Sequence, residues 1–176
     1  MTDKTEPTSP DHTREENLSK VAELVERAHL CMLTTMTADG KHVSRPMGLQ
    51  EAEFDGDLWF FVDDASAKVE QIRLNPSVNV SFSNPKSTEW TSISGTAELV
   101  HDKDKAAELW SPILNAWFND GLDTPGLALL KVRADSAEYW DGPSSRVASM
   151  LGMVRAAVTR DSDNYPSFEH DSVEFS

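Results

Sequence analysis

Two cations and one hydroxyl group stand where they could bind a phosphate. Arg45 lies in a predicted strand, and Ser66 and Lys68 lie at the predicted start of a helix. The first N–H groups of a helix have no acceptor within the helix, and the helix dipole favours an anion there. A hydroxyl, an ammonium group and a guanidinium group that can bind in a bidentate manner would complete such a site. The alternative is that both cations form surface ion pairs with acids such as Asp64 or Glu70.

Other chemistry-bearing residues form no recognisable catalytic or metal-binding pattern. The sequence has no glycine-rich phosphate loop, no CxxC motif and no serine-hydrolase motif. Cys31 lies in an apolar predicted strand, which favours a small buried hydrophobe over a nucleophile. Asp63 and Asp64 could form a carboxylate pair, although acids near a helix N-terminus are also explained by the helix dipole. The five histidines have no paired spacing, so we expect no metal site.

Composition limits the classes of partner. The chain has 176 residues and a formal net charge of −14, which suits one domain and argues against nucleic acid or an anionic membrane as the main partner. No apolar run is long enough to span a membrane, and the first residues contain no apolar stretch typical of a signal peptide. A single cysteine fits a reducing compartment, so we expect a cytoplasmic protein.

The acidic charge is concentrated at the two ends of the chain. Residues 1–13 and 159–176 are rich in acidic and small polar residues and poor in aliphatic ones. Such segments bury too little apolar surface to offset the entropy lost on ordering. We therefore predict one domain at residues 14–158 between two disordered acidic tails.

The elements that must position the candidate phosphate site are mostly strands. Thr13 and Glu16 have the spacing of a capping box, which predicts a helix over 14–28. Asp-Gly pairs at 39–40 and 55–56 predict two hairpins in series, and thus a three-stranded meander before the site helix. The expected elements of this part are strands at 31–36, 42–50 and 57–62 and a helix at 64–74.

The second half of the chain continues the pattern of short strands. Gly95 within the predicted strand 89–100 indicates a bulge, and Pro112 interrupts a helix capped by Asp102. The other expected elements are a strand at 77–83, a strand pair at 127–134 and 136–140, and a helix at 146–158. About six antiparallel strands with peripheral helices favour a small, mainly β barrel over a βαβ sheet.

Six short motifs in order resemble the general-stress-protein branch of the pyridoxamine 5′-phosphate oxidase-like flavoproteins. The motifs are RPM at 45–47, LWFFxxxxSxK at 58–68, GTAELV at 95–100, AAELW at 106–110, WFxxGxDxP at 117–125 and EYW at 138–140. The resemblance covers roughly residues 17–142. It implies a six-stranded antiparallel split β-barrel and a homodimer that binds flavin mononucleotide (FMN) in two clefts at the subunit interface.

The resemblance also implies a set of cofactor-binding residues. Arg45, Ser66 and Lys68 match the family's contacts to the flavin phosphate. The segments at 46–47 and 61–62 would lie along the ring and the ribityl chain. Gln50 stands where the true oxidases carry a lysine, Trp90 would lie near the ring, and Trp140 matches an aromatic from the second subunit. The full set is Arg45, Pro46, Met47, Gln50, Phe61, Val62, Ser66, Lys68, Trp90 and Trp140.

The chain departs from the true oxidases at three further positions. Arg146 matches the first of their three spaced basic residues. Ala148 replaces the histidine that binds pyridoxamine phosphate, and Met150 replaces the arginine that binds the flavin. Ala67 replaces an arginine that precedes the phosphate-binding lysine. We therefore expect no pyridoxamine phosphate oxidase activity.

Three functions remain open. The first is a flavin-dependent oxidoreductase that acts on a small-molecule substrate, in which the flavin carries the reactivity and no catalytic side chain is assigned. The second is an enzyme that holds a deazaflavin or a haem on the same barrel. The third is a non-enzymatic, ligand-binding dimer that has kept the barrel, which the residues at 148 and 150 favour.

Overall fold

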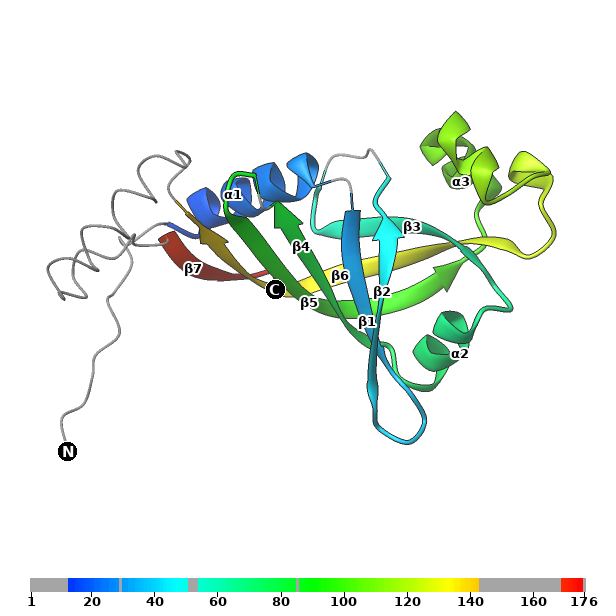
Figure 1. Cartoon of the computed structure of the whole chain (residues 1–176), viewed down its shortest axis with the longest axis horizontal. Helices are drawn as coiled ribbons and strands as arrows, with labels where there is room; N and C mark the ends of the chain where they lie inside the picture. The colour runs from blue at the N-terminus through cyan, green and yellow to red at the C-terminus, as the bar shows by residue number, and fades with distance from the viewer. Residues whose placement is uncertain (1–12, 29, 51–53, 85, 143–168, 176) are drawn as a thin grey trace, which may run out of the picture.

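The fold is described for five segments of the chain. A computed structural model defines residues 13–28, 30–50, 54–84, 86–142 and 169–175. The expected helix at 146–158 lies outside these residues, as do residues 1–12 of the expected N-terminal tail. Figure 1 shows the described elements as one curved, mainly antiparallel sheet with helices at its margins.

The sheet contains seven strands. Six of them follow the order β2-β1-β4-β5-β6-β3, and β7 pairs with β6 off this path. Every strand pair is antiparallel. The strands are β1 (Leu30–Met36), β2 (His42–Gly48), β3 (Asp57–Asp63), β4 (Ser77–Asn84), β5 (Glu89–Val100), β6 (Leu127–Asp141) and β7 (Glu169–Glu174). The expectation of a mainly β antiparallel barrel with peripheral helices is confirmed.

The longest strand, β6, joins the two halves of the sheet. One of its edges pairs with β5 along almost its whole length. Its other edge is shared, because β3 pairs with its first half and β7 with its second half. The pairing of β5 with β6 shifts register at Ser94 and Gly95, which confirms the expected bulge.

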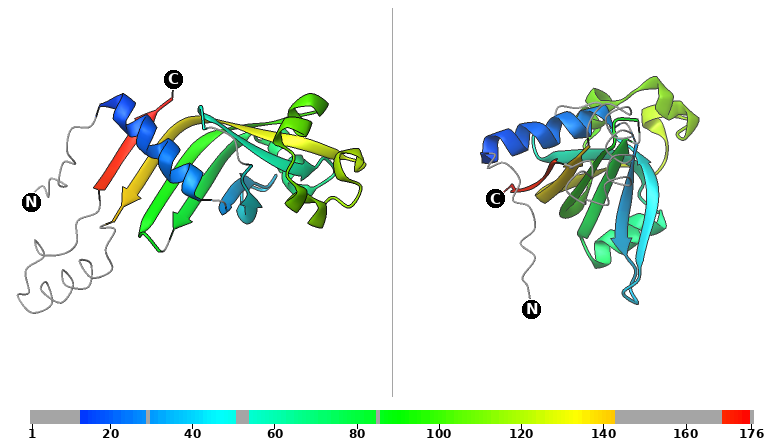
Figure 2. Two further views of the ribbon diagram at one scale, coloured as in Figure 1. Left: turned by 90° about the horizontal axis from the view of Figure 1, so that it is seen from above. Right: turned by 60° about the vertical axis from the view of Figure 1, so that its left-hand side comes forward.

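The inner face of the sheet carries the main core. Alternation along the strands turns Leu33, Val80 and Ile93 to this face, where none of them is exposed. Helix α1 (Arg14–Arg27) lies across β5, β6 and β7 on this face (Figure 2). The capping box between Thr13 and Glu16 begins α1, as the sequence predicts. Helix α2 (Ala67–Leu74) covers the inner face near β1.

A smaller cluster covers part of the opposite, outer face. Helix α3 (Lys103–Leu109) and the 3-10 helices η1 (Pro112–Ala116) and η2 (Gly121–Asp123) follow β5 and lead into β6. Phe61 and Leu129 of the sheet pack there against Leu109 and Leu114. The break between α3 and η1 at Pro112 is the predicted one, because proline lacks the N–H that a continuing helix needs.

The predicted three-stranded meander is wrong. Among the described strands β2 pairs with β1 alone, and β3 pairs with β6 instead. Phe60, Phe61 and Val62 are all buried, so β3 needs cover on both faces, which an exposed hairpin cannot supply. A backbone hydrogen bond from Gln50 N–H to Trp59 C=O, at 3.4 Å, links the end of β2 to β3.

Two further strand predictions need correction. The expected pair at 127–134 and 136–140 is the single strand β6, and Asp135 between them is the extra residue of the bulge. The seventh strand, β7, lies within residues 159–176, for which the sequence predicts a disordered tail. Val173 is buried and Phe175 packs edge-on to Phe54, so two apolar side chains bring this acidic segment onto the sheet.

Candidate functional site

The Arg45 guanidinium lies on the inner face of the edge hairpin, where neutral groups hold it. Arg45 pairs across the strands with Leu33, so both side chains share one face. Its Nη1 donates to Thr35 Oγ1 at 2.7 Å and to the Leu33 carbonyl at 3.4 Å, and its Nη2 donates to Gln71 Oε1 at 3.0 Å. Partial burial lowers the pKa of Arg45, because leaving water disfavours its charged form. The three acceptors therefore orient the cation without neutralising it.

The first turn of α2 brings a hydroxyl and a second cation to the same place. Ser66 is the N-cap residue, yet its side chain makes no capping hydrogen bond. Lys68 Nζ lies 3.5 Å from Ser66 Oγ. Burial lowers the pKa of Lys68, the charge of Arg45 lowers it further, and Asp63 opposes both effects. The first N–H groups of α2 also lack acceptors within the helix.

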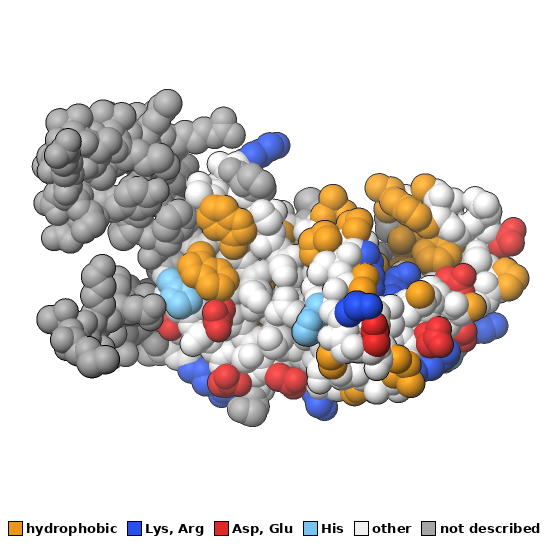
Figure 3. Space-filling view, turned by 60° about the horizontal axis from the view of Figure 1, so that its bottom comes forward, with side chains coloured by type: hydrophobic (Ala, Val, Ile, Leu, Met, Phe, Trp, Pro, Cys, Tyr) orange, Lys and Arg blue, Asp and Glu red, His pale blue; other side chains and the backbone are white. Residues whose placement is uncertain are grey.

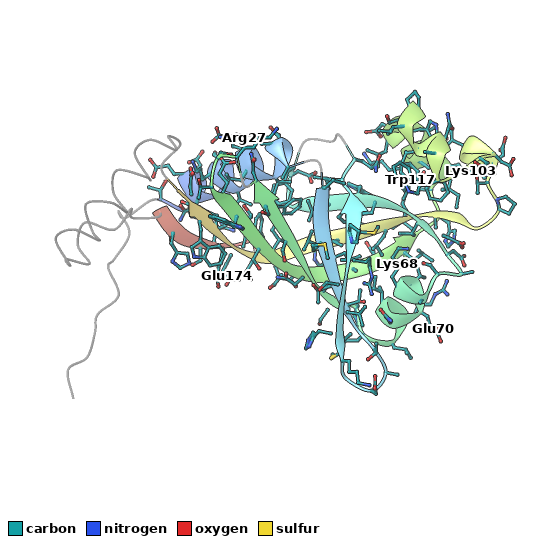
Figure 4. The ribbon with its side chains drawn as sticks, in the orientation of Figure 1. Arg27, Lys68, Glu70, Lys103, Trp117 and Glu174 are labelled. Carbon is teal, nitrogen blue, oxygen red and sulfur yellow. The ribbon has the colours of Figure 1, made fainter. Side chains whose placement is uncertain are left out.

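The alternative that both cations pair with surface acids is not supported. Asp64 instead contacts His101 Nε2 at 3.2 Å and Arg73 Nη2 at 3.7 Å. Glu70 is exposed, and Figure 4 shows it on the other side of α2 from Lys68. Within the described segments, no carboxylate lies within ion-pair distance of Arg45 or Lys68. Two neighbouring cations therefore share a site in which, among the described residues, neither forms an ion pair with a carboxylate and only Asp63 acts on Lys68 from a distance.

Three of the other residues expected around the cofactor have buried side chains. Phe61 and Val62 are buried, Phe61 against Trp110 and Phe118 and Val62 in the main core. Their backbone groups, rather than their side chains, are therefore the groups that could contact a ligand. Gln50 is buried too, and its Nε2 donates to the Gly48 carbonyl at 3.3 Å.

The two remaining residues of the edge hairpin stay accessible. Pro46 is exposed and Met47 is half-buried. Met47 lies on the same face of β2 as Arg45, two residues away. The hairpin can therefore present both residues to a ligand that binds Arg45.

The two candidate tryptophans lie on the other face of the sheet. Trp90 of β5 pairs across the strands with Trp140 of β6, and Trp140 in turn with His170 of β7. The Trp140 and His170 rings are stacked at 5.0 Å. Because Trp90 alternates with the buried Glu89 and Thr91, it belongs to the outer face, whereas Arg45 belongs to the inner face. One chain alone does not bring these tryptophans to the cations.

Figure 3 shows the molecule from the side that lies below in Figure 1, away from α1. Hydrophobic side chains gather on it in two areas, and largely polar surface separates them. Beside one area lies a hollow with Lys and Arg side chains at its edge. Alternation along β1 and β5 assigns the exposed apolar residues Leu30, Met32 and Trp90 to the outer face of the sheet.

Three residues near these groups escape sequence reasoning. Thr35 and Gln71 touch Arg45, but their neutral side chains carry no motif. His170 stacks on Trp140 from a segment predicted to be disordered. The alternation of buried residues in β1 could have placed Thr35 on the same face as Arg45, since it follows Cys31 and Leu33 at period two.

Of the residues at positions 67, 146, 148 and 150, only Ala67 falls within the described segments. Arg146, Ala148 and Met150 lie outside the described residues, and Ala67 is an exposed first residue of α2. Burial raises the pKa of the Cys31 thiol to about 12, so Cys31 is a buried hydrophobe rather than a nucleophile.

The described segments offer neither a metal-binding cluster nor a membrane-spanning helix. These segments contain no group of three acidic, histidine or cysteine side chains able to hold a metal ion. In the same part of the chain, every helix is too short or too polar to cross a membrane.

Comparison with curated proteins finds a fungal relative. The protein bli-3 of Neurospora crassa is 29% identical over 137 residues, which are 73% of this chain and 66% of that protein. The match therefore spans slightly less than two thirds of the relative's own length.

Solved structures with the same fold come from bacteria. The general stress FMN/FAD binding protein of Xanthomonas citri is 30% identical, with a TM-score of 0.65 over 74% of this chain and 92% of that one. General Stress Protein 26 of Bacillus anthracis is 23% identical, with a TM-score of 0.63 over 70% of this chain and 92% of that one. The second likeness shows the fold alone.

One family accounts for most of the chain. The family described as pyridoxamine 5′-phosphate oxidase like matches residues 16–164, which include every strand from β1 to β6 and both cations of the site. The fold agrees, because the solved relatives share its split-barrel sheet. The chain therefore belongs to the pyridoxamine 5′-phosphate oxidase-like family.

Proposed function

We propose that the chain binds FMN and fixes the cofactor's phosphate at Arg45, Ser66 and Lys68. The observation that carries the proposal is the pair of neighbouring cations, neither of which forms an ion pair with a carboxylate of the described residues. Phosphate supplies the missing negative charge, and it accepts the several donors that converge there. The family match and the flavin named for the Xanthomonas citri protein support the choice of FMN among phosphate ligands.

Each residue of the site has a distinct task. Arg45 is oriented by Thr35 and Gln71, so its remaining N–H groups are free to bind the phosphate in a fixed geometry. Ser66 donates its hydroxyl, because no capping bond occupies it. Lys68 supplies a point charge at the start of α2. FMN, when bound, supplies hydride exchange at N5 of its ring system, and the protein supplies position and electrostatics.

A homodimer is part of the proposal. Trp90 and Trp140 lie on the face of the sheet opposite Arg45, so a second copy is needed to bring such aromatics to the cofactor. Leu30, Met32 and Trp90 are exposed apolar side chains of the outer face, and burying them against a second copy would favour association. The site is then completed across the subunit interface.

We propose that the chain is a flavin-dependent oxidoreductase rather than a non-enzymatic binding protein, and an activity assay tests this. Purified protein loaded with FMN is expected to show a flavin absorption spectrum, to elute as a dimer, and to oxidise NADH or NADPH with an artificial acceptor. A dimer that binds FMN without any turnover would leave the cofactor proposal standing and reject the enzyme. Absence of FMN binding, with deazaflavin or haem bound instead, would reject the cofactor.

As the pH rises, FMN affinity should begin to fall at a lower pH than it would if Lys68 had the pKa of an ordinary lysine. Only protonated Lys68 attracts the phosphate, and burial lowers its pKa. The stability of the free protein should change in the opposite sense. The unfolded chain binds the proton more tightly, so stability rises with pH between the folded and unfolded pKa values of Lys68.

Titration of FMN from pH 7 to pH 10, with urea unfolding of the free protein at each pH, checks both signs. Lys68→Met should flatten the affinity profile and remove the rise in stability. An affinity that declines equally in both proteins would contradict this assignment of Lys68.

A further inference from the structure

We infer that Gln71 is the positioning residue that makes this site selective for a phosphate-bearing ligand, because it holds Arg45 with a neutral acceptor. The inference rests on the proposed function of the site and deepens it. It concerns a side chain that is not expected to touch the ligand itself. Its basis is the set of hydrogen bonds that joins β1, β2 and α2.

The three side chains form a closed set of hydrogen bonds. Gln71 Oε1 accepts from Arg45 Nη2 at 3.0 Å and from Thr35 Oγ1 at 2.5 Å. Thr35 Oγ1 in turn accepts from Arg45 Nη1 at 2.7 Å. Thr35 is only 1% exposed, so this anchor is fixed within the core. The guanidinium plane is therefore set by two separate nitrogens rather than by one flexible contact.

The same helix carries both the second cation and this acceptor. Lys68 and Gln71 are three residues apart in α2, so they lie on one side of the helix. Through Gln71, α2 fixes Arg45 of β2, and through Lys68 it supplies the neighbouring charge. A shift of α2 would move both groups together, so the spacing of the two cations depends on this contact.

The neutrality of the acceptor is what leaves the site able to bind an anion. A carboxylate at position 71 could accept the same two hydrogen bonds from nearly the same place. It would then form a partly buried ion pair with Arg45 and compete directly with the phosphate. The amide accepts these hydrogen bonds but carries no charge. The choice of glutamine over glutamate therefore separates an anion site from a structural salt bridge.

The variant Gln71→Glu separates these roles. We expect it to unfold at the same or a higher temperature than the parent protein, because Arg45 gains an ion pair. We expect its affinity for FMN to fall at least tenfold and its affinity for riboflavin, which lacks the phosphate, to stay within twofold. Inorganic phosphate should compete with FMN in the parent protein and lose this effect in the variant.

A matched control and a second variant complete the test. Asn75→Asp makes the same amide-to-acid change at the other end of α2, where the side chain accepts from the Ser77 N–H, and FMN affinity should change less than twofold. Gln71→Met removes the acceptor without adding charge, and it should weaken FMN binding several-fold. This variant decides the matter if the acidic one does not fold.

Two negative outcomes have different meanings. A parent protein that binds FMN and riboflavin equally would reject the proposed phosphate site. A parent protein that prefers FMN, together with Gln71 variants of unchanged preference, would overturn the role of Gln71 and leave the site intact.

Discussion

Replacing Arg45 with methionine is expected to weaken FMN binding about ten- to a hundredfold and to leave riboflavin binding almost unchanged. Hydrogen bonds to charged groups contribute about 1.5–3 kcal/mol each, and about 1.4 kcal/mol corresponds to a tenfold change in affinity. Within the described residues Arg45 donates to neutral acceptors, so its positive charge is available to the phosphate. Quenching of flavin fluorescence during titration measures both affinities in one format.

Arg73→Met is the matched control for this variant. It removes the same charge from the last turn of the same helix that carries Lys68, but Arg73 is exposed and lies 3.7 Å from Asp64. FMN affinity should change by less than about threefold, as expected for a screened surface charge. Equal losses in the two variants would mean that the general field of the protein, rather than a local contact, attracts FMN.

The largest expected loss of stability is at Gly95. A Cβ atom there would lie 2.3 Å from the Arg133 carbonyl oxygen and 3.1 Å from Val132 Cγ1, where the register of β5 and β6 shifts. A contact with backbone cannot be relieved by turning a side chain, so β5 or β6 must move. Overpacking of this kind costs about 1–3 kcal/mol and occasionally more, and we expect Gly95→Ala to lie at the upper end. The midpoint of urea unfolding measures the effect.

Gly48→Ala is the control for this substitution. A Cβ atom on Gly48 meets nothing within 4 Å, and the residue lies at the end of the edge strand β2. Its stability should stay within about 1 kcal/mol of the parent, because alanine also restricts the unfolded chain. Unfolding midpoints that coincide for the two variants would show that the bulge adapts and that the close contact is not a constraint.

Local signals predict the elements well and the pairing of strands poorly. The capping box at Thr13 and the glycine bulge at position 95 each depend on only a few neighbouring residues, so the sequence predicts them. The partner of β3 cannot be predicted in this way, because β6 begins more than 60 residues later and the two strands pair as part of the buried core. β7 escapes prediction for a related reason, as Val173 and Phe175 are too few to stand out in an acidic segment.

The candidate site divides in the same way. Charged and hydroxyl side chains at a strand and at a helix start indicate a candidate phosphate site, so the sequence alone is enough to propose Arg45, Ser66 and Lys68. Thr35 and Gln71 acquire their role only when β1, β2 and α2 meet, and neutral side chains leave no trace of this in the sequence. The sequence could not place Trp140 relative to Arg45 either, because their faces of the sheet depend on long-range pairing.

The most direct test of the central claim is the ratio of the affinities of the unaltered protein for FMN and for riboflavin. The two ligands share the ring system and the ribityl chain and differ only in the phosphate. If Arg45, Ser66 and Lys68 bind that phosphate, FMN should bind at least a hundredfold more tightly, and the preference should shrink as salt or inorganic phosphate is added. Equal affinities for the two flavins, or a preference that added phosphate does not reduce, would contradict the account.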